Sequence, residues 1–181
     1  MTSPTRDYAN IALIGFMGCG KSSVGQLVAE HLEFDFVDTD TLIEQLAGMS
    51  IGRIFSTEGE AAFRELETRV VNELAHRQRT VIATGGGLGA HANHVETLKT
   101  HALVVFLWAS PEVIWRRVKS HSHRPLLQGP DPRGTIEALL AQREPVYRQA
   151  DVLINSEKRP LREVAQQVAH QFEQAHKPAG S

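Results

Sequence analysis

The sequence predicts an α/β protein with a parallel sheet that is covered by helices on both faces. Short, nearly all-apolar segments alternate along the chain with longer segments whose apolar residues recur at helical spacing. The most apolar short segment is 102–108, and the clearest helical stripe runs through 58–77. Strands that are apolar at every position are typical of parallel sheets buried on both faces by their connecting helices.

The composition indicates one domain without a global charge preference. The chain has 181 residues, and 19 basic and 21 acidic side chains give a formal net charge of −2. This balance provides no general attraction to nucleic acid or anionic membranes, and no apolar run reaches the roughly 20 residues of a membrane span. We therefore expect a single cytoplasmic, monomeric domain over 1–181 that binds neither nucleic acid nor membrane, with flexible ends at about 1–8 and 176–181.

The first half of the chain is expected to fold into three strands and four helices. Gly48 should end the second helix, and the third helix carries one continuous apolar stripe through Phe63, Leu66, Val70 and Leu74. In order, these elements are strand 10–14, helix 23–32, strand 34–37, helix 41–47, helix 58–77, strand 80–84 and helix 91–99.

The second half continues the alternation around a polar segment. After the strand at 102–108, Ser110 and Pro111 are typical of the first turn of a helix. A loop-like segment over about 119–133 follows, and then a helix at about 134–149 that Pro145 should kink or restart. The last expected elements are a strand at 151–154 and an amphipathic helix behind Pro160.

A phosphate-binding loop stands between the first strand and the first helix. Residues 15–22, Gly-Phe-Met-Gly-Cys-Gly-Lys-Ser, match the pattern G-x-x-x-x-G-K-[ST]. Its glycines let successive N–H groups, among them those of Gly18, Cys19, Gly20 and Ser23, converge on phosphate oxygens at the positive end of the helix. Lys21 would contact the β- and γ-phosphates of ATP, and the Ser22 hydroxyl is a natural Mg²⁺ ligand. Cys19, the only cysteine in the chain, could be a redox group, but we interpret it as a small loop residue.

Further polar signals follow other strands. In a parallel sheet, ligands bind beyond the carboxyl ends of the strands, where Asp38 and Asp40 are expected. One carboxylate could hold a metal-bound water while the other orients or deprotonates an acceptor hydroxyl; alternatively, either aspartate merely caps the helix that follows.

Three glycines, Gly85, Gly86 and Gly87, follow another strand. Glycine is suited to backbone that passes close to a ligand, although a flexible helix entry would explain the same residues.

The segment around 116–133 is basic and lacks matching acids. Arginine on a mobile loop can neutralise charge that develops during phosphoryl transfer, and a solvated basic loop is the ordinary alternative. His121 and His123 lie in this segment without a third metal ligand in view, so a zinc site is not expected there.

The ordered set of motifs resembles shikimate kinases over about residues 10–172. Besides the phosphate-binding loop and the Asp38-Thr39-Asp40 segment, the resemblance rests on Phe63-Arg64-Glu65, the three glycines, Arg124-Pro125-Leu126-Leu127 and Arg143-Glu144-Pro145-Val146-Tyr147. It implies a three-layer α/β/α fold with a five-stranded parallel sheet, as in P-loop kinases of the nucleoside monophosphate kinase type, with a mobile lid at about 119–133. It also implies transfer of the ATP γ-phosphate to the 3-hydroxyl of shikimate in the pathway to chorismate and the aromatic amino acids.

The same resemblance assigns roles by position. Lys21, Asp40 and Arg124 would be catalytic, and Ser22 and Asp38 would hold Mg²⁺, the expected cofactor. Arg117, Lys158 and Pro160 would join the phosphate-binding loop and Arg124 in binding ATP. Shikimate would bind to Asp40, Arg64, Gly85, Gly86, Gly87 and Arg143. A pair of arginines suits the carboxylate of shikimate, and Asp40 suits its hydroxyls.

Two other functions fit part of the pattern. A gluconate kinase could use the same scaffold, although Asp38, Asp40, Arg64, the glycines and Arg143 together favour shikimate. A nucleotide-dependent switch that hydrolyses ATP slowly would leave the two acceptor-side arginines and the basic segment without a purpose.

Overall fold

The computed structural model describes residues 8–120 and 129–176. In this part of the chain five parallel strands form one sheet in the order β2-β3-β1-β4-β5. The elements are β1 (Asn10–Ile14), α1 (Lys21–Leu32), β2 (Asp35–Asp38), α2 (Thr39–Ala47), α3 (Ile51–Thr57), α4 (Gly59–Leu74), β3 (Thr80–Ala83), the short 3₁₀ helix η1 (Leu88–Ala90), α5 (Ala92–Lys99), β4 (Ala102–Trp108), α6 (Pro111–Val118), α7 (Pro132–Tyr147), β5 (Val152–Asn155) and α8 (Leu161–His176).

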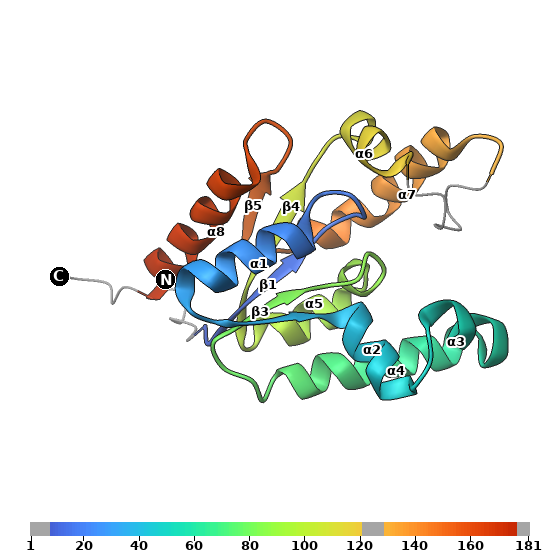
Figure 1. The fold of residues 1–181 in the computed structure, drawn as a ribbon, viewed down its shortest axis with the longest axis horizontal. Coiled ribbons are helices and arrows are strands. Elements are labelled where there is room, and N and C mark those ends of the chain that lie inside the picture. Colours follow the sequence, from blue (N-terminus) through green and yellow to red (C-terminus); the bar gives the residue numbers. More distant parts are fainter. Residues whose placement is uncertain (1–7, 121–128, 177–181) are drawn as a thin grey trace.

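The sheet is the middle layer of three (Figure 1). Every residue of β1 and β3 is buried, whereas the edge strands β2 and β5 keep exposed positions. Helices α1 and α8 pack side by side over one face, and α4 and α5 lie together over the other. The three-layer α/β/α architecture expected from the apolar strands is therefore confirmed.

The strand order places the functional site. The chain runs from β1 to β2 toward one edge of the sheet and from β3 to β4 toward the other, so the loops that follow the neighbouring strands β1 and β3 open beside each other at the carboxyl edge. Figure 1 shows α2, α3 and α4 gathered beyond β3, and α6 and α7 beyond β4. The carboxyl edge thus lies between two groups of helices.

Several predicted boundaries shift for local reasons. The helix expected at 134–149 begins at Pro132, because the Asp131 side chain caps it by accepting a hydrogen bond from Gly134 N at 2.9 Å. This helix continues as one element through Pro145, which lies in its last turn and removes only one backbone donor. The helix expected at 58–77 ends at Leu74.

A short helix that was not expected from the sequence, α3, is capped by the Ser50 hydroxyl. The lid segment falls mainly on residues 121–128, outside the described residues. Among the helices of the described residues, none is long and apolar enough to span a bilayer.

Candidate active site

A cavity of about 600 Å³ opens at the carboxyl edge of the sheet. Its walls come from the loops after β1, β2, β3 and β5 and from the end of α6, so segments far apart in sequence meet here. It is lined by Met17, Gly18, Gly20, Lys21, Ser22, Ser23, Asp38, Asp40, Thr84, Gly85, Gly86, Arg117, Val118, Arg159, Pro160 and Leu161.

The phosphate-binding loop turns sharply into α1. Gly20 is the N-cap residue with φ 96°, a left-handed conformation that favours glycine, and no side chain caps the helix. The first N–H groups of α1 therefore face the cavity end of the helix without a side-chain acceptor, as an anion site requires. Lys21 is 8% exposed, and its Nζ donates to Gly15 O at 2.8 Å and Phe16 O at 3.0 Å.

The Asp38 carboxylate caps the helix that follows it and also contacts Ser22. Its Oδ1 accepts a hydrogen bond from Asp40 N at 3.0 Å and caps α2. Its Oδ2 accepts from the Ser22 hydroxyl at 2.8 Å. One carboxylate oxygen and one hydroxyl oxygen thus meet at the start of α1, a pair of hard oxygen donors of the kind that suits Mg²⁺ with bound phosphates and waters. Within the described residues, no group of three or more acidic, histidine or cysteine side chains could hold a metal by itself.

Asp40 has an unusual acidity. Burial, reinforced by the nearby charge of Asp38, raises the pKa of its carboxyl from 3.8 to about 6, although Lys21 opposes this shift. A carboxyl with this pKa is mostly ionised at neutral pH and still holds a proton more readily than an exposed aspartate. Asp40 is therefore suited to orient a hydroxyl group or accept its proton.

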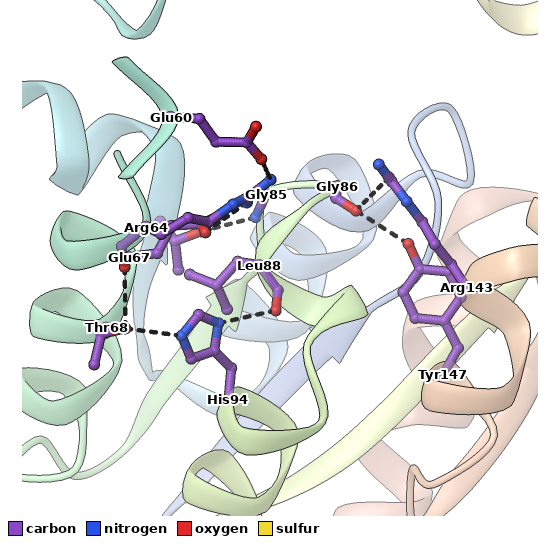
Figure 2. A network of polar contacts seen from close by, with 11 residues as sticks. Glu60, Arg64, Glu67, Thr68, Gly85, Gly86, Leu88, His94, Arg143 and Tyr147 are labelled. Atoms are coloured by element: carbon purple, nitrogen blue, oxygen red, sulfur yellow. Dashed lines mark hydrogen bonds and ion pairs between the residues drawn. The ribbon is translucent and has the colours of Figure 1, made fainter. Parts of the chain in front are cut away.

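The three glycines form a junction that contacts Asp40 and the two predicted arginines. Figure 2 shows Arg64 on one side of Gly85 and Gly86 and Arg143 on the other. The Asp40 carboxylate occupies the space that a Cβ on Gly85 would need. Arg143 Nη1 donates to Gly86 O at 3.0 Å, and a Cβ on Gly87 would lie 3.2 Å from Arg64 Nη1. Each glycine therefore lies against a different one of the three side chains. Gly87 also precedes η1, so the alternative of a helix entry applies to this glycine.

Arg64 is held in place by two acids on its own helix. Its Nη1 donates to Glu67 Oε2 at 2.7 Å and its Nη2 to Glu60 Oε1 at 3.0 Å. The Glu67 side chain is 1% exposed, so this carboxylate is buried beside the guanidinium. The arginine is thereby fixed next to the glycines, and two carboxylates already pair with its single positive charge.

The opposite end of the cavity joins the phosphate-binding loop to the loop after β5. Arg117 Nη1 donates to Gly18 O at 3.1 Å and its Nη2 to Ser156 O at 2.8 Å. Pro160 lies on the same wall. Arg117 and Pro160, which the resemblance implies in adenine binding, therefore both line this cavity.

Most predicted site residues come together, with particular exceptions. Arg159, which the sequence analysis did not single out, lines the cavity, whereas Lys158 does not. Cys19 is fully buried, and its thiol donates to Phe16 O, which supports a packing role. Arg64, Gly87 and Arg143 are not among the residues that line the cavity. Arg124, His121 and His123 are outside the described residues.

Three residues that were not expected from the sequence hydrogen-bond to groups of the site. Glu67, three residues after Arg64 on α4, could have been found from its spacing. Thr39 Oγ1, which accepts from Gly85 N at 2.7 Å, and the Tyr147 hydroxyl, which donates to Gly86 O at 3.0 Å, bond to backbone atoms. No side-chain pattern in a sequence indicates such partners.

Comparison with known proteins agrees with this geometry. The family model for shikimate kinase matches residues 17–173. A shikimate kinase of Thermodesulfovibrio yellowstonii is 44% identical over 164 residues, which cover 91% of this chain and 95% of the relative. A shikimate kinase of Synechococcus is 48% identical over 161 residues, 87% of this chain and 84% of the relative.

Solved structures give the same family. The shikimate kinase of Acinetobacter baumannii in complex with shikimate superposes with a TM-score of 0.87 and 38% identity, covering 96% of this chain and 99% of that chain. A gluconokinase from Sinorhizobium meliloti reaches a TM-score of 0.60 at 18% identity, with 93% and 94% covered, and shares the fold alone. By sequence, fold and site geometry, the chain belongs to the shikimate kinase family.

Proposed function

We propose that this protein transfers the γ-phosphate of ATP to the 3-hydroxyl of shikimate, giving shikimate 3-phosphate and ADP. The observation that carries the proposal is the junction at the three glycines, which puts one carboxylate and two arginines beside a phosphate-binding loop. Relatives that span nearly the whole chain are shikimate kinases, and one of them was solved with shikimate. A polyhydroxylated carboxylate is the class of acceptor that such a junction suits.

The chain's own groups divide the work between two halves of the cavity. Lys21 and the N–H groups at the start of α1 hold the β- and γ-phosphates and stabilise charge as it moves onto the bridging oxygen. Arg64 and Arg143 bind the acceptor carboxylate, which turns the ring so that one hydroxyl faces Asp40. Asp40 then orients that hydroxyl and can accept its proton, while Arg117 and Pro160 hold the base of the nucleotide.

The oxygen pair of Ser22 and Asp38 supports Mg²⁺ as the cofactor. The ion would neutralise charge on the β- and γ-phosphates. We also propose that Arg124 supplies a further positive charge to the transferred group, and that the enzyme acts as a monomer in the cytoplasm, where the lone buried Cys19 would stay reduced.

The direct test compares three acceptors in one coupled assay of ADP release: shikimate, gluconate and water. We expect rapid, shikimate-dependent turnover and only background release with the other two. Turnover with gluconate would favour a sugar-acid kinase, and acceptor-independent release would favour a switch.

Replacing Arg143 with alanine should affect the acceptor far more than the nucleotide. Its guanidinium bonds to Gly86 O on the acceptor side. In the proposed site it also binds the acceptor carboxylate, so its loss would remove a charged hydrogen bond to shikimate. We expect the KM for shikimate to rise about 10- to 100-fold. The KM for ATP should change little, as steady-state kinetics with each substrate varied would show.

The matched control is Arg148→Ala. Arg148 follows the same helix, pairs with Glu144 at 2.6 Å and has a side chain that is 62% exposed. Its loss should leave both KM values unchanged. Equal increases for shikimate and ATP in Arg143→Ala would contradict a carboxylate contact.

Replacing Gly85 with alanine should displace Asp40, because the new Cβ would occupy the space of that carboxylate. A displacement of about 1 Å can cost about 10²-fold in rate, so we expect a loss of this order in kcat/KM for shikimate. Gly52→Ala is the control, since a Cβ there meets nothing within 4 Å. Wild-type kcat/KM in Gly85→Ala would show that the junction does not set the position of Asp40.

A further inference from the structure

Two buried hydroxyls, those of Thr39 and Tyr147, hydrogen-bond to the glycine junction, and Figure 2 shows the bond from Tyr147 to Gly86. Thr39, in the first turn of α2, accepts the Gly85 N–H on its Oγ1 at 2.7 Å. Tyr147, the last residue of α7, donates its hydroxyl to Gly86 O at 3.0 Å. Both residues are 0% exposed, and neither lines the cavity.

The junction needs such support because of its composition. Three consecutive glycines have more backbone freedom than any other tripeptide, and ordering them costs conformational entropy. A hydrogen bond at Gly85 N and another at Gly86 O fix the peptide groups on both sides of the Gly85–Gly86 bond. The segment that separates Asp40 from the two arginines is therefore held by side chains from α2 and α7.

The Tyr147 bond also bears on Arg143. The Gly86 carbonyl accepts hydrogen bonds from both the Tyr147 hydroxyl and Arg143 Nη1, each at 3.0 Å, and a carbonyl has two lone pairs for two donors. Burial raises the pKa of Tyr147 to about 12, so its hydroxyl keeps its proton and stays a donor at neutral pH. The Tyr147 ring packs against Phe106 with centroids 5.1 Å apart, a contact that phenylalanine would preserve.

We propose that Thr39 and Tyr147 are positioning residues for the acceptor: their hydroxyls hold the glycines in the conformation that presents Asp40 and Arg143 to shikimate. This inference rests on the proposed function. Neither hydroxyl is assigned a contact with a substrate, and each acts through the backbone of Gly85 or Gly86. Their removal should therefore weaken acceptor binding and spare the nucleotide half of the cavity.

The test uses Tyr147→Phe and Thr39→Val, each of which removes the hydroxyl and keeps most of the side-chain shape. We expect each to raise the KM for shikimate, and the Kd for shikimate measured by calorimetry without ATP, by about 5- to 10-fold. The KM for ATP should stay within about twofold of wild type. Thr39→Ser, which keeps the hydroxyl, should restore the wild-type value.

Thr80→Val is the matched control for a general loss of stability. The Thr80 hydroxyl is also buried and also donates to a backbone carbonyl, Gln78 O, at 3.0 Å, but at the opposite end of β3. The Thr80→Val variant should have a melting temperature lowered about as much as that of Tyr147→Phe, and its KM for shikimate should be unchanged. Because both proposed residues hold one loop, the effects of Tyr147→Phe and Thr39→Val should be less than additive when combined.

The outcomes separate this inference from the function on which it rests. A wild-type protein that phosphorylates no shikimate would refute the proposed function. An active wild type whose two variants keep its shikimate Kd would refute the positioning roles alone. So would variants that change both KM values equally, or a Thr39→Ser variant as weak as Thr39→Val, because either result would indicate a purely structural contribution.

Discussion

Lys21→Ala should lower kcat by about 10²- to 10³-fold, because it removes a preorganised positive charge from the transferring phosphate. The Lys21 ammonium is buried and lies on two backbone carbonyls, those of Gly15 and Phe16, so it is already at the mouth of the phosphate-binding loop before nucleotide binds. The fold should survive, since these bonds lie within one loop. Single-turnover kinetics and a thermal melt would measure the two effects separately.

Lys99→Ala is the matched control for Lys21→Ala. Lys99 also donates to a backbone carbonyl, Gln149 O, at 2.7 Å. It lies just before β4, at the amino end of that strand and away from the phosphate-binding loop. Its loss should leave kcat unchanged. Near-normal turnover in Lys21→Ala would refute the assignment of the phosphate-binding loop.

Asp40→Asn should lower activity and raise stability. The variant keeps the shape of the side chain but can neither accept a proton nor hold a hydroxyl by charge, so we expect kcat to fall by about 10²-fold or more. A change confined to the KM for ATP would instead place Asp40 on the metal.

The stability effect of Asp40→Asn follows from the raised pKa. The folded protein holds the Asp40 proton up to about pH 6, whereas the unfolded chain releases it near 3.8. The contribution of this group to the free energy of unfolding is therefore greatest below pH 3.8, falls between those values and stays low above pH 6. Asparagine removes the penalty, so the variant should be more stable at pH 8 by about 1 to 3 kcal/mol and no more stable than wild type at pH 3.5.

Urea unfolding at both pH values, without nucleotide or metal, would measure this difference. Equal stability at pH 8 would show that the Asp40 carboxylate is not strained by burial. Higher stability together with lower turnover would indicate that the Asp40 carboxylate lowers the free energy of unfolding and is kept because turnover needs it.

The fold could be predicted where the side chains themselves carry the signal. The β4 strand, 102–108, has its predicted bounds because it is apolar throughout and lies between polar residues and a capping Ser110. The α3 helix was missed because it is short and contains Gly52, so its apolar spacing is weak. Only the Ser50 cap could have indicated it.

Some residues of the site could likewise be predicted from the sequence, and others could not. Lys21, Asp38 and Asp40 could be placed together because the carboxyl ends of parallel strands share one edge. The hydrogen bond from Tyr147 could not be predicted, because its partner is a backbone carbonyl 61 positions away. A tyrosine in the sequence indicates only that an aromatic ring is buried there. Arg159 lines the cavity where Lys158 was expected. Which of the two does so depends on the path of one loop, and the composition of that loop does not determine its path.

The most direct test of the central claim is a ³¹P NMR spectrum of a completed reaction of the wild-type protein with ATP, Mg²⁺ and shikimate. The account predicts one new phosphomonoester signal, coupled to the proton on carbon 3 of shikimate, in an amount equal to the ADP formed. Orthophosphate in place of the phosphomonoester, or a phosphate on another hydroxyl, would contradict a site in which the three glycines, Asp40 and the two arginines present the 3-hydroxyl to the nucleotide.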